Sequence, residues 1–159
     1  MMRTKNRFIR SALSIVFAGS VFCLEASADS PVLPADVQFS DMAVSASLTG
    51  VAGDAAAGRK IFANRKQGNC LACHAATDLK EQLFHGGVGP SLDGAGSRWS
   101  EGQLRAIVVN AKTMFSSETV MPGFYTLEVG ADVRKDLIGK TILSAQQVED
   151  VVAYLTTLK

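Results

Sequence analysis

Cys70-Leu71-Ala72-Cys73-His74 is a CxxCH motif, and the interpretation of the rest of the chain depends on it. In this spacing two thiols can reach the two vinyl groups of one haem, while the imidazole that follows meets the iron. We therefore predict one covalently attached haem c, bound through Cys70 and Cys73, with His74 as an axial ligand of the iron.

Two other chemistries use the same residue types. A thioredoxin-like redox pair needs a preceding strand and a βαβ context, and the sequence shows no strand pattern there. A zinc site needs a second cluster of cysteines or histidines, whereas the only other histidine is His85. The context of the motif therefore favours haem over both alternatives.

The first 28 residues have the three parts of a secretory signal peptide. A basic start precedes an apolar run at residues 11–24, and small residues end the segment at residues 26–28. The run is shorter than the ~18–20 residues that cross a membrane, which argues against a retained anchor. We predict cleavage near Ala28, loss of Cys23 with the peptide, and a periplasmic protein without a membrane anchor.

Composition limits the classes of partner. The chain has 159 residues and is 47% hydrophobic, which is enough for a single domain with its own core. Removal of residues 1–28 leaves 12 basic and 14 acidic residues, so the formal charge of the mature chain is −2. This balance gives no reason to expect a nucleic acid partner.

The mature chain is expected to have two parts. Residues 29–53 contain prolines and little periodicity, which predicts an extended N-terminal arm. Residues 54–159 form the predicted domain. The arm is more apolar than a solvated linker, so we expect it to dock against the domain or a partner. The apolar residues that favour docking are Val37, Phe39, Met42, Val44 and Leu48.

Local signals predict three helices in the domain. Asp54 caps a short helix that ends at Phe62, Ser100 begins a second, and a capping box at Ser144 begins a third that ends near Lys159. Turn-rich stretches separate them, and no strand pattern is present. The predicted fold is therefore all-α, with short helices and loops around a cofactor. The expected buried residues are Leu104, Ile107 and Val108 in the second helix, and Val148, Val151, Val152 and Leu155 in the third.

Two further residues are predicted to serve the iron site. A ligating imidazole needs an acceptor for its other N–H, and the rigid backbone at Pro90 can present a carbonyl to the ring of His74. For the sixth ligand we favour Met121, because a thioether raises the reduction potential and Pro122 stiffens the loop. Met114 and then His85 are the competing ligands, and a core position is the ordinary role of a lone methionine.

These motifs resemble those of class I cytochromes c and, within that class, the SoxX family, the small monohaem subunits of SoxAX cytochromes in sulfur-oxidising bacteria. The resemblance covers almost the whole mature chain, and GNCLACH and the VVN of residues 108–110 are its most discriminating parts. Its motifs are GNCLACH at 68–74, GVGPSLDG at 87–94, IVVN at 107–110, VMPGFY at 120–125 and VEDVVAYL at 148–155.

The resemblance implies a function and a set of partners. The chain is expected to form a heterodimer with a larger haem-c subunit, SoxA-like, that the arm contacts. The complex acts as an L-cysteine S-thiosulfotransferase: it joins thiosulfate oxidatively to a cysteine of a carrier protein and releases two electrons. This chain is then a non-catalytic subunit that passes electrons to a soluble cytochrome c. After processing, Cys70 and Cys73 are its only cysteines, so no free thiol is left for catalysis.

Two other functions fit the same motifs. A free-standing periplasmic electron shuttle is the first alternative, and the apolar arm argues for a permanent subunit instead. A sensor of nitric oxide or carbon monoxide is the second, and it requires a weak sixth ligand. Co-purification with a second haem protein separates the subunit from the shuttle, and rapid carbon monoxide binding identifies the sensor.

Overall fold

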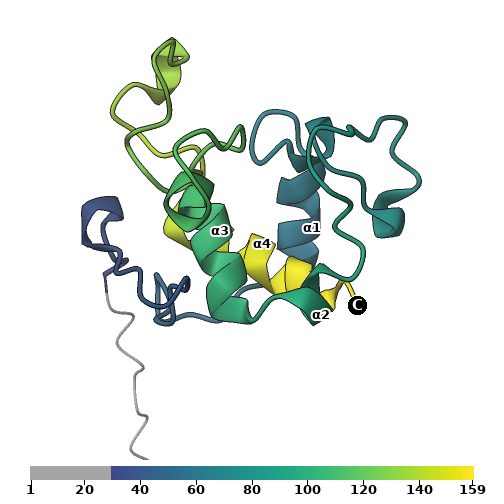
Figure 1. The fold of residues 1–159 in the computed structure, drawn as a ribbon, viewed down its shortest axis with the longest axis horizontal. Helices are drawn as coiled ribbons and strands as arrows, with labels where there is room; N and C mark the ends of the chain where they lie inside the picture. The colour runs from purple at the N-terminus through teal and green to yellow at the C-terminus, as the bar shows by residue number, and fades with distance from the viewer. Residues whose placement is uncertain (1–29) are drawn as a thin grey trace, which may run out of the picture.

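The computed structural model describes residues 30–159, so the predicted signal peptide, its cleavage site and Cys23 lie outside the described residues. This part of the chain is all-helical, as predicted, and long loops join its short helices (Figure 1). The α-helices are α1 (Ala55–Ala63), α2 (Ala95–Arg98), α3 (Glu101–Met114) and α4 (Ala145–Thr157). The 3-10 turns are η1 (Pro34–Asp36), η2 (Cys70–Ala72), η3 (Thr77–Leu79) and η4 (Lys135–Leu137).

The three longer helices begin where their caps predict. The Asp54 carboxylate accepts the N–H groups of Ala56 and Ala57 at the start of α1. Ser100 and Ser144 both form complete capping boxes, in α3 and α4. These contacts satisfy N–H groups that have no partner within the helix, so each start is fixed by neighbouring residues alone.

The core lies where α4 packs against α1 on one side and α3 on the other (Figure 1). Gly58 allows the close approach of α1, because a Cβ atom there would overlap the carbonyl of Asp150. Phe62 and Tyr154 meet edge to face beside it, with ring centroids 5.4 Å apart. The predicted apolar face of α4 is buried throughout, whereas in α3 Leu104 and Val108 are buried and Ile107 is only partly buried.

Two features of the helices differ from the sequence prediction. The stretch that reads as a turn contains the four-residue helix α2, whose Gly96 N–H donates to the carbonyl of Leu158 at 2.8 Å. Helix α3 is also broken at Asn110, whose backbone is extended (φ −157°, ψ 93°). Both features depend on contacts with distant parts of the chain.

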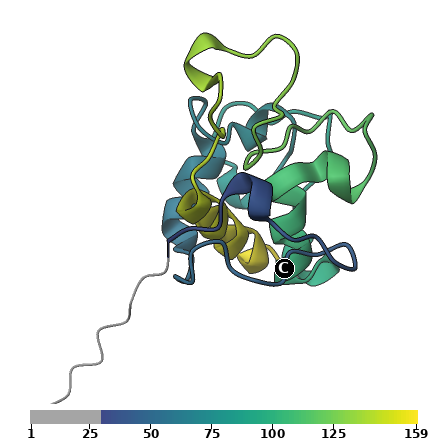
Figure 2. The ribbon, with the colours of Figure 1, turned by 90° about the vertical axis from the view of Figure 1, so that its left-hand side faces the viewer.

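The N-terminal arm docks against the domain, one of the two outcomes expected for it, and Figure 2 shows it lying across α3 and α4. Val44 and Leu48 are each 2% exposed and belong to the common core. Burial of each apolar side chain contributes about 1.5–3 kcal/mol. Met42 is 53% exposed.

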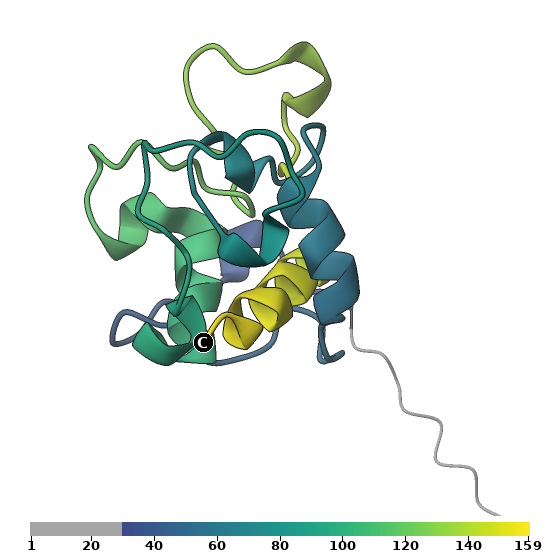
Figure 3. The ribbon, with the colours of Figure 1, turned by 90° about the vertical axis from the view of Figure 1, so that its right-hand side faces the viewer.

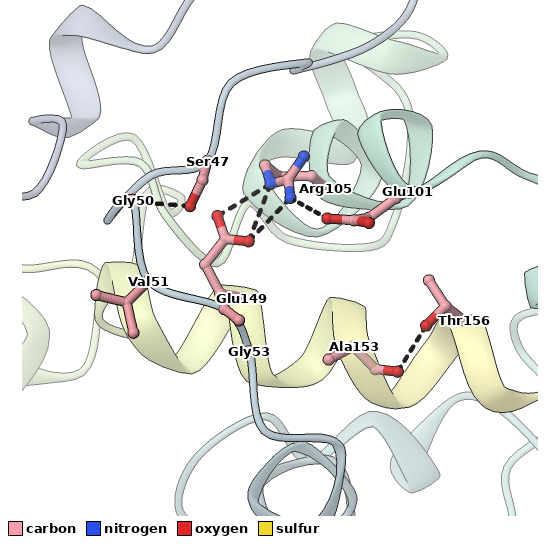
Figure 4. Close-up of a pocket in the computed structure, with 10 residues that line it drawn as sticks. Ser47, Gly50, Val51, Gly53, Glu101, Arg105, Glu149, Ala153 and Thr156 are labelled. Atoms are coloured by element: carbon pink, nitrogen blue, oxygen red, sulfur yellow. Dashed lines mark hydrogen bonds and ion pairs between the residues drawn. The ribbon is translucent and has the colours of Figure 1, made fainter.

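A buried ion pair attaches this arm to both helices (Figure 4). Arg105 of α3 and Glu149 of α4 are 2.9 Å apart, and each side chain is 4% exposed. The Arg105 guanidinium also donates to the carbonyl of Val44 at 2.9 Å, and the Glu149 carboxylate accepts the N–H of Leu48 at 2.8 Å. Each charge is therefore paired and hydrogen-bonded, as burial requires.

Candidate functional site

The CxxCH motif forms η2 and the turn that follows it, in the loops between α1 and α2 that face the viewer in Figure 3. The N–H groups of Cys73 and His74 donate to the carbonyl of Cys70 at 3.1 and 2.9 Å, which gives residues 70–74 a helical turn. Leu71 is 6% exposed and anchors this turn in the core. Cys70 and Cys73 are partly buried thiols that form no disulfide.

The surroundings of Cys70 do not suit a reactive thiolate. Burial raises the pKa of the Cys70 thiol to about 12, since the charged form would be poorly solvated. Redox-active cysteines have a lowered pKa instead. The local chemistry therefore disfavours a thioredoxin-like pair in this part of the chain.

The imidazole of His74 is held from one side. Its Nδ1 lies 2.8 Å from the carbonyl oxygen of Pro90, so an N–H at this nitrogen donates to that oxygen. Gly89 lies against the ring, and a Cβ atom there would overlap it. The Gly89 N–H donates to the carbonyl of Cys73 at 2.8 Å, which holds the segment around Gly89 against the CxxCH motif. This arrangement leaves Nε2 of His74 as the nitrogen available to a metal.

The two competing ligands have other partners. His85 Nδ1 accepts the N–H of Ala76 at 3.3 Å, and its Nε2 lies 3.0 Å from the carbonyl of Leu79, so both ring nitrogens contact the backbone. Met114 is 7% exposed and belongs to the core cluster. Met121 is only partly buried at the edge of that cluster. Of the three side chains, Met121 therefore has the surroundings that best suit the predicted sixth ligand.

These residues fit a haem c. Two thiols spaced for the vinyl groups and an imidazole with one free nitrogen form the donor set, and Gly89 leaves the room that the ring needs. Large apolar side chains, which an apolar macrocycle or a partner would cover, are exposed in the loops on either side of these residues. They are Leu83, Phe84, Val88, Phe115 and Val120. In residues 30–159, no group of three His, Cys, Asp or Glu side chains is placed to hold a metal ion.

A polar network supports the segment that follows His74. The guanidinium of Arg59 in α1 donates to Asp78 at 2.7 Å and Glu81 at 2.9 Å, and the Tyr154 hydroxyl of α4 donates to Asp78 at 2.9 Å. The hydrogen bond from Arg59 lowers the pKa of the Asp78 carboxyl. This network could not be predicted from the sequence, because Arg59 and Tyr154 lie 19 and 76 positions from Asp78.

Comparison with known proteins identifies the class. Residues 55–159 match the cytochrome c family, and the chain belongs to that family. It is an electron carrier whose relatives bind haem c covalently, and the spacing of Cys70 and Cys73 is consistent with that attachment. No curated protein matches the chain.

The chain is similar to a solved structure described as the crystal structure of SoxXA from P. pantotrophus. The identity is 44%, the match covers 82% of this chain and 99% of that chain, and the TM-score is 0.75. The resemblance to SoxX drawn from the motifs is thereby confirmed. Within residues 30–159, no helix has the length and hydropathy needed to cross a membrane.

Proposed function

We propose that this chain is the monohaem electron-transfer subunit of a SoxAX-type complex. It accepts electrons from the haem of a larger, SoxA-like subunit and passes them to a soluble cytochrome c. The observation that carries the proposal is the 44% identity over 99% of the SoxXA chain, together with an intact CxxCH motif. Residues 54–159 form the haem domain, and residues 29–53 contribute to contact with the larger subunit.

Five residues of this chain would hold the cofactor. Cys70 and Cys73 would attach it through thioethers, and His74 would bind the iron through Nε2. Pro90 accepts the Nδ1 hydrogen of His74, which fixes the plane of the ring and makes the imidazole a stronger donor. Met121 would supply the sixth ligand. A haem c bound there supplies one-electron redox chemistry.

The same residues limit the chain's share in the reaction. Joining thiosulfate to the thiol of a carrier protein forms one sulfur–sulfur bond and releases a proton and two electrons. This chain carries one electron at a time, and with Cys70 and Cys73 bound to haem it offers no thiol to thiosulfate. The bond-forming chemistry therefore belongs to the larger subunit. Export by the signal peptide at residues 1–28 places this chain in the periplasm.

The test is to express the chain with its leader, with and without a SoxA-like subunit, in a host that attaches haem c. We expect the two haem proteins to co-purify. The isolated chain should be reduced and reoxidised reversibly, yet should not conjugate thiosulfate to a carrier thiol. Turnover by the isolated chain would overturn the division of labour, and failure to bind any SoxA-like subunit would overturn the complex.

A free-standing electron shuttle stays the second candidate, and the arm is the reason. Two of its apolar residues, Val44 and Leu48, are buried in the chain's own core, so they do not require a partner. Leu33, Met42 and Val51 are the large apolar side chains of the arm that are exposed. A shuttle would be monomeric in the presence of every haem protein of the same periplasm.

A further inference from the structure

The break in α3 changes what the helix carbonyls bind. In a regular helix the carbonyls of Val108 and Val109 would accept N–H groups four residues later. Because Asn110 is extended, they instead accept the N–H groups of Phe124 and Tyr125, both at 3.1 Å. The N–H of Lys112, two residues after the break, donates to the Asn110 side-chain oxygen at 3.2 Å.

Phe124 and Tyr125 lie at the end of the loop that follows α3, and the side chain of Lys112 attaches the start of that loop. Its ammonium group donates to the carbonyls of Ser117 and Thr119, at 3.1 and 2.5 Å. Residues 116–119 form a turn in which the Thr119 N–H donates to the carbonyl of Ser116 at 3.0 Å. Lys112 therefore binds two carbonyls of one turn, just before Met121.

Met121 lies between these two attachments. Thr119 precedes it by two positions and Phe124 follows it by three. At Gly123 the loop approaches the break closely, since a Cβ atom there would lie 3.1 Å from the Val109 carbonyl oxygen. The path from Thr119 to Phe124 is thus fixed at both ends by α3, and Pro122 stiffens its middle.

We infer that Asn110 and Lys112 are positioning residues, which hold the loop of residues 115–125 (the Met121 loop) so that the thioether of Met121 stays at the sixth position. This inference rests on the proposed role of Met121 as the sixth ligand. The attachment exists only when the loop is closed, so a weaker attachment raises the fraction of molecules in which the sixth position is open. An external ligand then binds with higher apparent affinity, because less closed loop has to be displaced.

The test uses the haem-loaded, oxidised protein and imidazole as the external ligand. Lys112→Met removes the ammonium group but keeps an unbranched side chain of nearly the same length. Lys60→Met, on the exposed face of α1, removes the same charge from a side chain that forms no hydrogen bond in the described part of the chain. A hydrogen bond to a charged group typically changes an equilibrium by about tenfold or more. We therefore expect the apparent imidazole affinity to rise about tenfold in Lys112→Met and to stay unchanged in Lys60→Met.

The Asn110→Ala variant tests the other attachment. It removes the acceptor of the Lys112 N–H and favours a regular helix, which competes for the carbonyls of Val108 and Val109. We expect a similar rise in imidazole affinity. Hydrogen exchange at the Phe124 and Tyr125 amides should be faster than in the parent, as a readout that does not involve the iron.

Different results would overturn the ligand role of Met121 and the positioning role of Asn110 and Lys112. If Met121→Ala keeps the absorption band that reports a sulfur–iron bond, the ligand assignment is wrong and the proposed site falls with it. If Met121→Ala loses the band but Lys112→Met and Asn110→Ala bind imidazole no better than Lys60→Met, Met121 is the ligand and the positioning role is wrong.

Discussion

The segment that carries His74 and the loop that carries Met121 are attached to the domain in different ways. His74 is held inside its own segment, by Gly89 and Pro90, which lie 15 and 16 positions later. Met121 depends on a different element, the broken helix α3, through Lys112 at one end of its loop and backbone carbonyls at the other. One predicted ligand is thus fixed locally, and the other is fixed by tertiary structure.

This difference bears on how firmly each side of the site is held. The His74 ring has a glycine against one face and a carbonyl on Nδ1, so a change there creates overlap or an unpaired polar group. The Met121 loop is attached by a few hydrogen bonds, some of them exposed, which are individually weak. We therefore expect single substitutions to move the Met121 loop more easily than the segment that holds the His74 ring.

The largest effect should follow from Met121→Ala, which removes the predicted sixth ligand. We expect loss of the sulfur–iron band and a fall in reduction potential on the order of 100 mV, a fraction of the range of about 0.8 V that axial ligands span. Absorbance and potentiometric titration of the purified protein measure both. Met114→Leu is the matched control, because it changes a buried methionine of α3, and its band should be unchanged. The opposite pattern would assign the ligand to Met114.

A smaller effect is expected on the His74 side from Gly89→Ala. The added Cβ overlaps the imidazole, and overpacking of this kind costs about 1–3 kcal/mol of unfolding free energy. Gly87→Ala is the control in the same loop, because nothing lies within 4 Å of a Cβ there. Its stability should be unchanged or higher by up to about 1 kcal/mol. Urea unfolding of the haem-loaded proteins would contradict the account if both variants were equally stable.

The smallest effect is expected in the polar network of Arg59, Asp78 and Tyr154, which supports the segment that follows His74. Asp78 has a pKa below its ordinary value of 3.8, chiefly because Arg59 donates to it, so the ionised form stabilises the fold. That contribution is complete above the unfolded-state pKa and is lost as the pH falls through the folded-state pKa. Since Asp78 is 47% exposed, Asp78→Asn should cost about 0.2–1 kcal/mol at pH 7 and less below pH ~4.

The control for this network is Asp132→Asn, at an exposed carboxyl that forms no ion pair in the described part of the chain. Urea unfolding of both variants and the parent at pH 7 and pH 3 makes the comparison. A stability difference between Asp78→Asn and the parent that grows as the pH falls would reverse the sign expected here.

Features with a local cause could be predicted from the sequence. The caps at Asp54, Ser100 and Ser144 lie within three residues of the groups they bind, so the starts of α1, α3 and α4 are correct. The CxxCH motif likewise contains its own spacing. The helix ends were predicted less accurately, since α1 ends at Ala63, one position later than predicted, and α4 ends at Thr157, two positions earlier.

Features with a distant cause were missed. Arg105 and Glu149 are charged residues within helices, where such residues ordinarily face water, and only the fold shows that they are buried as a pair. The break at Asn110 was missed because IVVN continues a helical pattern, and its cause is a loop that lies more than ten positions later. The hydrogen bonds that Arg105 and Glu149 form with Val44 and Leu48 of the arm were not predicted either.

The central claim is that Cys70 and Cys73 bind one haem and that His74 ligates its iron. Trypsin releases both cysteines and His74 in one peptide between Lys66 and Lys80, so mass spectrometry of that peptide, together with the Soret absorbance of the intact protein, tests the claim directly. We predict a peptide heavier by one haem, with no free thiol. An unmodified peptide from a colourless, exported protein would contradict the account.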